Sequence, residues 1–366
     1  MQAGRCKWRE VFETLRREIR TGRYSADHAL PSEAQTMVRF GVGRQTARRV
    51  FDELVHARLV VRRQGAGAFL SSNLRLGTGR IGLIVHGSSY CEIFAPIARR
   101  ISHLCQSSGR TLLFADISDV DTHARVRKVI ATAREYARLG VDGVIFQPVE
   151  LLGTSCRINA DLVKIFRKAG IPVVLLDSDS VPPPERSDCD LAAVNHFNAG
   201  RRLATHLRQQ GAKRLAYLMQ ENRAPCVQER WAGIRAGAEG LELAGELLLM
   251  EPDDRVRIAR AMKRLRPDAV ACYNDRQAVL FVKTLESLGY RVPRDVLVAG
   301  FDDINYATIA TPQLTSMHQP CEAIADLAFD MLLTRMRKPT LPPRETFLDA
   351  ELTVRESTKR KTKCRR

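Results

Sequence analysis

The chain has 366 residues, enough for two or three domains, and its 45% hydrophobic and 27% charged residues are typical of a globular protein with a buried core. Its formal net charge is +17: residues 1–75 hold 15 Lys and Arg against 7 Asp and Glu (+8), residues 355–366 hold 7 against 1 (+6), and the remainder is close to neutral. Basic ends on a near-neutral body favour a polyanion-binding function over solubility alone.

Nine scattered cysteines without a Cys-x-x-Cys pair argue against a disulfide framework and a zinc site. The apolar runs are far too short to span a bilayer, so no membrane partner is expected. Free thiols and the lack of a visible signal peptide predict a cytoplasmic protein.

The first predicted elements are helices. Residues 8–22 carry an apolar stripe at helical spacing. Ser32 is placed to cap a second helix, which ends near Phe40 because residues 41–43 form a Gly-Val-Gly turn. A third helix is predicted over residues 44–57, with an inward apolar stripe. The side chains left on or near its outward face are Arg44, Gln45, Arg48 and Arg49.

Two short helices joined by a tight turn make a helix-turn-helix, and the first turns of its second helix enter the major groove of DNA. Arginine suits these turns because its planar guanidinium pairs with guanine or clamps a phosphate. The stretch LVVRRQGAGAFL, residues 59–70, predicts two short strands around a glycine-rich tip. We expect this wing to bring Arg62, Arg63 and Gln64 to the DNA backbone or minor groove.

Four segments within residues 8–71, LPSE, FGVGRQTAR, ELVHARLV and RRQGAGAF, resemble the winged helix of GntR-type regulators. The family pattern is LPSER, VSR-x-TVR and GxGxF. Ala34 and Gly43 lack the arginine and the hydroxyl that the family places there, and Ala47 replaces a valine. Together, the resemblance and the outward helix face predict DNA contacts at Ser32, Glu33, Arg44, Gln45, Thr46, Arg48, Arg49, Arg63, Gln64 and Gly65.

Residues 72–80 are small, polar and glycine-containing and are expected to form a linker. Beyond them, short apolar runs alternate with helical patterns, which indicates parallel sheets with helices on both faces. Ligands bind at the carboxyl ends of the strands in such sheets. The strands are predicted at 81–85, 111–116, 143–147, 172–177, 214–219, 269–273 and 297–301, with helices at 94–107, 122–139 and 198–210.

The sequence lacks the common motifs of nucleotide binding and catalysis, namely G-x-G-x-x-G after a strand, G-x-x-x-x-G-K-[ST], H-E-x-x-H and G-x-S-x-G. The polar residues after the predicted strands combine carboxylates with Asn, Gln and Arg, a set that can donate to and accept from sugar hydroxyls. We therefore expect a protein that is not an enzyme and uses no cofactor or metal. The alternative is a cytoplasmic sugar-binding protein or enzyme with an accessory basic domain.

A series of segments over roughly residues 80–356 resembles, in family order, the effector domain of LacI/GalR-type repressors, itself similar to periplasmic sugar-binding proteins. The segments are RIGLIV, GVDGVIFQP, GIPVVLLD, VNHFNAGRRLATHLRQQGAKRLAYL, ERWAG, CYNDRQAV, VLVAGFDD and LTSMHQP. The resemblance implies an effector-binding and dimerisation domain over residues 81–356. Lobe 1 would comprise 81–194 and 320–345, lobe 2 would comprise 195–318 and 347–356, and a basic tail would follow at 357–366.

The effector contacts implied by the resemblance, together with the polar Gln147 after a predicted strand, are Ser89, Ile93, Gln147, Asp177, Arg230, Asn274, Asp302 and Gln319. Neighbouring polar residues are expected to have structural roles: to cap helices, to close turns, to orient a neighbouring side chain or to make hydrogen bonds within the core. They are Asp275, Asp303, Glu229, His86 and His196. Trp231 either lines the pocket or packs in the core.

The pairing of the two domains resembles the arabinose-responsive repressors of bacteria. It implies a winged helix-turn-helix (α+β) joined to an α/β two-lobed, periplasmic-binding-protein-like domain with parallel sheets. The expected function is that of a one-component transcription regulator, a repressor of sugar-utilisation genes. A mono- or disaccharide would change its affinity for double-stranded operator DNA, and it would act as a homodimer, nucleoid-associated in the bacterial cytoplasm.

Overall fold

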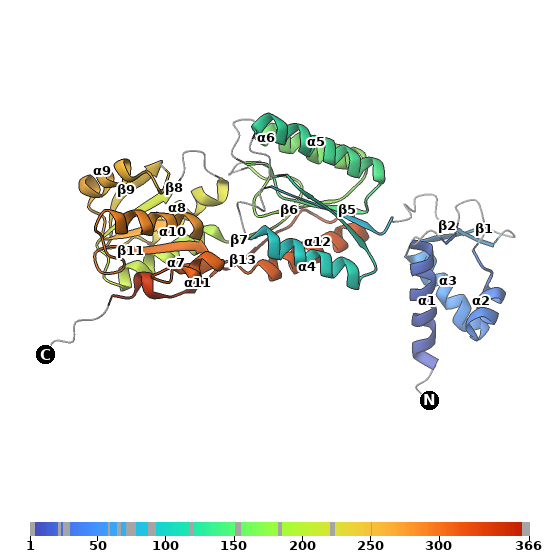
Figure 1. Cartoon of the computed structure of the whole chain (residues 1–366). Coiled ribbons are helices and arrows are strands. Elements are labelled where there is room, and N and C mark those ends of the chain that lie inside the picture. Colours follow the sequence, from blue (N-terminus) through green and yellow to red (C-terminus); the bar gives the residue numbers. More distant parts are fainter. Residues whose placement is uncertain are drawn as a thin grey trace.

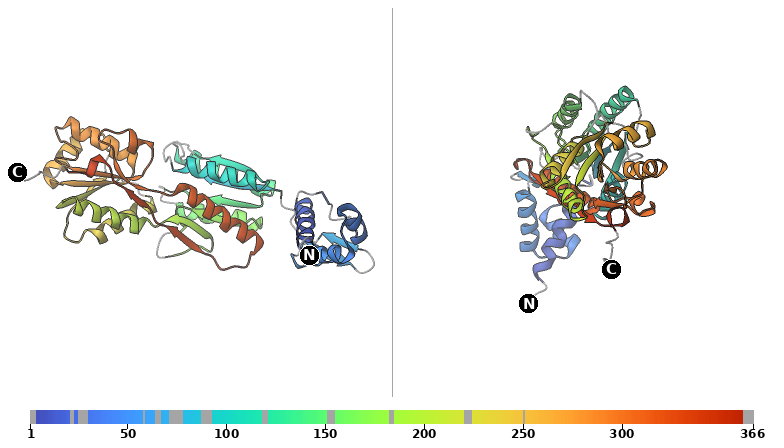
Figure 2. Two further views of the ribbon diagram at one scale, coloured as in Figure 1. Left: turned by 90° about the horizontal axis from the view of Figure 1, so that it is seen from below. Right: turned by 90° about the vertical axis from the view of Figure 1, so that its left-hand side faces the viewer.

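The structure, a computed structural model, describes most of the chain as an N-terminal module and two α/β lobes (Figure 1). The described residues are 4–20, 23–24, 30–57, 59–63, 67–70, 78–86, 93–117, 121–150, 155–181, 185–219, 224–249 and 251–360. Figure 2 shows the N-terminal module at one end of the molecule.

The N-terminal module packs three helices against a two-stranded antiparallel sheet. Its core is built from the apolar stripes of the first and third helices, with Leu15, Ile19, Phe51 and Leu54 almost completely buried. The elements are α1 (Gly4–Arg20), α2 (Glu33–Phe40), α3 (Arg44–His56), β1 (Val60–Arg63) and β2 (Gly67–Leu70). The first helix begins earlier than the predicted residue 8, because its polar first turn continues the helix without contributing to the apolar period that marked it, and residues 21–22 of the predicted helix lie outside the described residues.

Lobe 1 contains a six-stranded parallel sheet in the order β13-β7-β6-β5-β3-β4. Helices α5 and α6 lie on one face and α4 and α12 on the other (Figure 1). The elements are β3 (Arg80–Val85), α4 (Phe94–Ser107), β4 (Thr111–Asp116), α5 (Thr122–Leu139), β5 (Gly143–Phe146), α6 (Ser155–Lys168), β6 (Val173–Leu176), β7 (Asp190–Val194), α12 (Cys321–Arg337) and β13 (Glu345–Leu348).

Lobe 2 contains a second six-stranded sheet, β14-β12-β11-β10-β8-β9, parallel except for β14. Helices α7 and α8 cover one face and α9 and α10 the other. The elements are α7 (His196–Gln209), β8 (Arg214–Met219), α8 (Pro225–Gly237), β9 (Glu242–Leu249), α9 (Arg255–Leu265), β10 (Ala269–Cys272), α10 (Asp275–Ser287), β11 (Leu297–Asp302), α11 (Asn305–Ile309), β12 (Thr315–His318), β14 (Glu351–Thr353) and the 3-10 helix η1 (Glu356–Thr358).

The chain crosses between the lobes three times: after β7, between β12 and α12, and between β13 and β14. One continuous apolar cluster includes residues of both lobes. Each fully buried large apolar side chain, such as Phe301, contributes about 1.5–3 kcal/mol to folding. Among the described residues, no helix is long and apolar enough to span a membrane.

The structure differs from the expected lobe boundaries near the C-terminus. Phe347 pairs with Ala193 and Leu348 with Val194, so residues 347–348 belong to lobe 1 and the crossing follows them. Two strands of lobe 1 were not predicted. Strand β13, with the sequence ETFL, is short and half-exposed, and strand β7 is rich in alanine, which has little β propensity. Strands β9, β12 and β14 were also missed.

The predicted basic tail begins later than residue 357. Ser357 and Thr358 have no exposed surface. The Ser357 hydroxyl accepts from the Thr315 amide (2.8 Å) and donates to the Val298 carbonyl (2.6 Å). The composition of this segment is that of a solvated tail, yet its hydroxyls complete the hydrogen bonding of the lobe 2 sheet, and Arg360 still donates to the Gly211 carbonyl (3.1 Å).

Candidate functional site

The outward face of α3 carries exposed arginines. Arg44, Gln45 and Arg48 are exposed and Thr46 is half-buried, while Ala47 is buried against the module core. The helix begins after Gly43, which provides no side-chain cap for the first-turn amides. Uncapped amides at a helix N-terminus are suited to a phosphate group. The face thus combines positive charge with backbone donors.

Several of the other predicted DNA contacts have partners within the module. Ser32 and Gln35 form a capping box at the start of α2. The Arg62 guanidinium bridges Glu33 (2.9 Å) and Asp52 (3.1 Å). The remaining two described residues lie over aromatic rings: Arg49 is 4.3 Å from the Trp8 centroid and Arg63 is 4.6 Å from that of Phe69. Gln64 and Gly65 lie outside the described residues.

A buried carboxylate holds α1 and α2 together. Glu18 on α1 pairs through both oxygens with Arg39 on α2, and it also accepts from Tyr24 (2.6 Å) and Arg23 (2.6 Å). The hydrogen bond from Arg39 lowers the pKa of Glu18 to about 2, despite an opposing effect of burial. This contact was not predicted, because a charged residue on a helix gives no sign in the sequence of a partner 21 positions away.

In the effector domain, three aspartates at strand ends have left-handed backbones. Asp177 directly follows β6 with φ 71°, Asp302 ends β11 with φ 105°, and Asp303 follows with φ 56°. Residues other than glycine rarely adopt this region, at a cost on the order of 1–3 kcal/mol each. The surrounding fold holds these carboxylates in orientations that a relaxed strand would not give.

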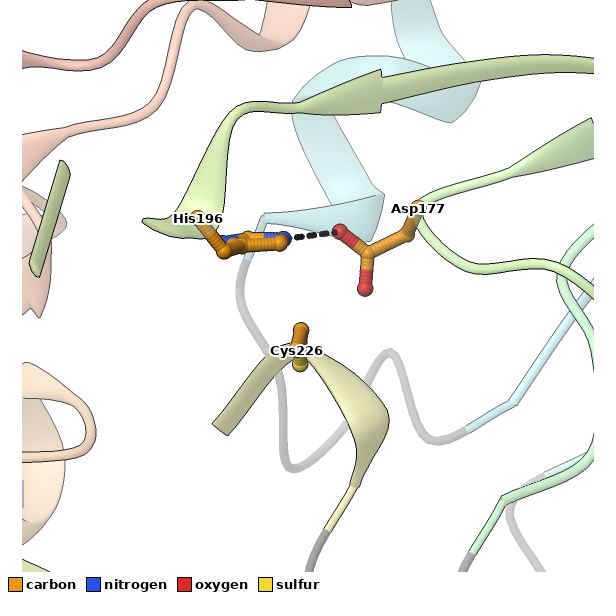
Figure 3. A group of neighbouring side chains, drawn as sticks. All are labelled: Asp177, His196 and Cys226. Carbon is orange, nitrogen blue, oxygen red and sulfur yellow. Dashed lines mark hydrogen bonds and ion pairs between the residues drawn. The ribbon is translucent and has the colours of Figure 1, made fainter. Parts of the chain in front are cut away.

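A buried relay of hydrogen bonds joins the two lobes. Arg230 on α8 donates from Nε to His196 Nδ1 (3.2 Å), and His196 Nε2 lies 3.2 Å from Asp177 Oδ1 (Figure 3). Arginine can only donate, so His196 Nδ1 must accept and its Nε2 must carry the hydrogen. Burial, followed by the charge of Arg230, lowers the pKa of His196, which favours this neutral form. His196 was expected to be structural, and here it connects the predicted site residues.

Arg230 also contacts the ends of two strands in lobe 2. Its Nη1 donates to the Tyr273 carbonyl (2.6 Å), its Nη2 lies 3.8 Å from Asp302 Oδ1, and its Cζ lies 3.6 Å from the centroid of Phe301. Gln319 donates from Nε2 to the same Asp302 oxygen (2.6 Å). Arg230, Asp302 and Gln319 are 5%, 5% and 1% exposed. The structure therefore gathers three predicted effector residues, Asp177, Asp302 and Gln319, near the guanidinium of a fourth, Arg230.

The remaining predicted effector residues have other contacts. Gln147 accepts through Oε1 from the His86 amide (2.8 Å), and Asn274 accepts from the Gln277 amide (3.0 Å) as the cap of α10. Ile93 is buried just before α4, and Ser89 lies outside the described residues.

Two of the neighbouring residues expected to be structural, Asp275 and Asp303, have well-defined partners. Asp275 does not cap α10 as predicted; it accepts from the Ser316 hydroxyl (2.6 Å) and the Ile304 amide (3.0 Å). Asp303 pairs with Arg355 (2.6 Å). Trp231 stacks on Tyr217 within the core, with 5.4 Å between centroids, so packing is the observed alternative.

Two further carboxyl groups lie close to this cluster. Glu150, which follows β5, accepts from the Ser178 hydroxyl (2.8 Å) next to Asp177. Burial, followed by the negative charge of Asp177, raises the pKa of Glu150 to about 8. The same two causes raise the pKa of Glu229, on α8 beside Arg230. Sequence reasoning missed Glu150, although its position three residues after Gln147 at a strand end was a usable signal.

Asp177, His196 and Cys226 each place one potential metal-ligating atom within 4.8 Å of the others (Figure 3). The relay already uses both nitrogens of His196, with a hydrogen on Nε2. A metal ion there would also lie near the Arg230 guanidinium, whose positive charge would repel it. This geometry therefore suits hydrogen bonding better than metal ligation.

Comparisons with known proteins agree with both parts of the structure. Residues 7–70 match the family described as bacterial regulatory proteins, gntR family, and residues 204–358 match the periplasmic binding protein-like domain. These matches confirm the two predicted domain types and their order.

The relatives found are transcription regulators. A PurR-type transcriptional repressor of Mannheimia succiniciproducens is 29% identical over 300 residues, covering 80% of this chain and 85% of that protein. An arabinose metabolism transcriptional repressor of Geobacillus stearothermophilus is 24% identical over 368 residues, covering 96% and 98%. The structure of a transcriptional regulator, CelR, in complex with cellobiose aligns with a TM-score of 0.64 and 22% identity over 93% of this chain and 94% of that one. The chain is therefore a transcription regulator in which a DNA-binding domain of the gntR family is joined to a periplasmic-binding-protein-like effector domain.

Proposed function

We propose that a small sugar-like ligand binds among Asp177, Arg230, Asp302 and Gln319, between the lobes, and thereby changes the affinity of the regulator for its operator. The observation that carries this proposal is the buried relay from Arg230 through His196 to Asp177, which joins lobe 2 to lobe 1 at the strand ends. Sugar hydroxyls both donate and accept, so they can compete for each link of such a relay. The cellobiose complex of the similar regulator CelR supports a sugar class.

The regulator acts in this proposal as a homodimer in the bacterial cytoplasm, with two winged helices on a pseudo-palindromic operator. An exposed edge of lobe 1 supports self-association. Strand β4 is the outermost strand of its sheet, and its Phe114 is 48% exposed. An unpaired strand edge with exposed apolar side chains tends to be covered by another chain.

The ligand must prefer one arrangement of the lobes, since equal affinity for both would shift nothing. The chain entering lobe 1 from the DNA-binding module is held there by Asp142, which accepts from the amides of Thr78 (2.6 Å) and Gly79 (3.0 Å). A rotation of lobe 1 would therefore move the attachment point of the DNA-binding module, and in a dimer the spacing of the two modules.

Arg44→Ala and Arg48→Ala should each weaken operator binding. Both side chains are exposed on the outward face of α3, and loss of a base-reading arginine costs about 1–3 kcal/mol, while loss of a phosphate contact lowers the salt slope by about 1. The measurement is a fluorescence anisotropy titration at several salt concentrations, with an operator selected from random DNA by the parental protein. The control is Arg134→Ala, which removes the same positive charge from an exposed position on α5. Parental affinity and salt slope in both α3 variants would show that another surface binds the DNA.

Asp302→Ala should weaken binding of the ligand, because it removes the partner of Gln319 and a neighbour of Arg230. Leaving such buried groups unpaired costs about 1–3 kcal/mol. Calorimetry with a sugar identified by thermal-shift screening measures this, and operator binding without sugar checks the fold. Asp330→Ala, an exposed carboxylate on α12, is the control. Equal sugar affinity in a folded Asp302 variant would place the ligand elsewhere.

A further inference from the structure

Each donor group of the proposed effector site already contacts an acceptor of the protein. Arg230 donates to His196 and to the Tyr273 carbonyl and directs its third nitrogen toward Asp302. His196 has its hydrogen on the nitrogen facing Asp177, and the Gln319 amide nitrogen donates to Asp302. A ligand that enters this cluster therefore meets donor groups that each already donate at least one hydrogen bond to a protein acceptor or, in the case of His196, face one.

Acceptors, by contrast, remain. The Gln319 side chain is 1% exposed, and its Oε1 has no hydrogen-bond partner among the residues that the structure describes. Figure 3 shows the second carboxylate oxygen of Asp177 directed away from His196, on the side of Cys226. Glu150 accepts from Ser178 through one oxygen. A buried acceptor without a donor is unfavourable, so the site is suited to a ligand that brings donors.

The charge of the cluster is unbalanced in the same sense. Among the residues that the structure describes, four carboxyl groups, those of Glu150, Asp177, Glu229 and Asp302, lie near one positive charge, that of Arg230, and His196 is neutral in the relay. Burial, followed by the charge of Asp177, raises the pKa of both glutamates, so their carboxyl groups tend to keep a proton while Asp177 and Asp302 carry negative charge beside the single cation Arg230. A cation that entered the cluster would favour the ionised form of both glutamates.

We propose that the effector carries a protonated amino group and is an amino sugar or another small polyhydroxylated amine. An ammonium group supplies three donors and one positive charge, the two properties that the cluster lacks. A neutral sugar supplies donors without charge, and a sugar acid would add to the repulsion. This inference rests on the proposed function, since it names the chemical class of the ligand for the same site.

The test uses matched ligands and the full-length protein. D-glucosamine, D-galactosamine and D-mannosamine are each compared by thermal shift and calorimetry with the N-acetylated form and with the parent hexose, at a pH where the amine is protonated. We expect at least one amine to bind about tenfold or more tightly than both of its uncharged counterparts, the ratio that corresponds to 1.4 kcal/mol. Glu150→Gln keeps the shape and an acceptor for Ser178 but cannot ionise beside a bound cation, so it should abolish most of this preference. Asp177→Asn is the second variant.

The outcomes separate this inference from the proposed function. A parent hexose that binds as tightly as its amine, with loss of binding in Asp302→Ala, overturns the inference and leaves the site in place. An amine whose affinity is unchanged in Glu150→Gln, Asp177→Asn and Asp302→Ala binds elsewhere, and both proposals fail. If no amine in the panel binds, the inference is overturned. DNA binding is tested independently of this result, by the operator titrations of the Arg44 and Arg48 variants.

Discussion

Arg230→Ala should lower the free energy of unfolding of lobe 2 by about 3–5 kcal/mol, the usual cost of removing one partner from a buried charged pair. The side chain is 5% exposed and joins His196, the Tyr273 carbonyl and Asp302. Alanine leaves each of these groups without its cation or donor, and the ring of Phe301 loses the guanidinium that covers it. The free energy of unfolding of Arg230→Lys should lie between those of the parental protein and Arg230→Ala, because lysine restores the positive charge but not the planar guanidinium.

Urea unfolding followed by tryptophan fluorescence measures this loss. The chain has two tryptophans, and Trp231 stacks on Tyr217 beside Arg230, so a Trp8→Phe background isolates the signal of lobe 2. Arg201→Ala, an exposed arginine on α7 that donates to Asn198, is the control and should change stability by no more than about 0.5 kcal/mol. Equal midpoints and slopes for Arg230→Ala and Arg201→Ala would contradict the assigned burial of Arg230.

Gly233→Ala should destabilise the same lobe by about 3 kcal/mol, the upper end of the usual range for overpacking. A Cβ atom at Gly233 would lie 1.9 Å from the Phe197 carbonyl oxygen on α7, and one at Gly200 would lie 2.1 Å from the Arg230 carbonyl oxygen. Backbone atoms cannot rotate away as a side chain can, so α7 and α8 must separate. Because α8 carries Arg230 and α7 begins at His196, the same change should loosen the relay and weaken the response to the effector.

Gly43→Ala is the matched control for this substitution. Its Cβ would meet nothing within 4 Å, and its backbone is in the extended region. Glycine is preferred over alanine at an N-cap, so this exchange should cost roughly 0.5–1 kcal/mol, well below the effect expected at Gly233. Thermal melting monitored by circular dichroism compares the two variants. A Gly233→Ala protein that melts with the parental profile would mean that the two helices are farther apart than the structure places them.

The sequence by itself determined the elements whose causes are local. Helix α3 follows from an apolar stripe that recurs within four residues and from the turn at residues 41–43. The strands at 111–116 and 214–219 follow from short apolar runs bounded by turn residues. The order of motifs also identified the two domain types. These signals act over a few residues, so they survive without any knowledge of the fold.

Only the tertiary structure decided what those elements bring together. His196 and Arg230 are 34 positions apart and Arg230 and Tyr273 are 43 apart, and no periodicity connects them. The strands β7 and β13 are weak by propensity and pair with each other across 154 positions of chain, while β7 also pairs with β6. Ser357 and Thr358 look like part of a solvated tail until Thr315 supplies their partners. Contacts of this kind are selected by the packing of two complete sheets, and packing depends on all of the chain at once.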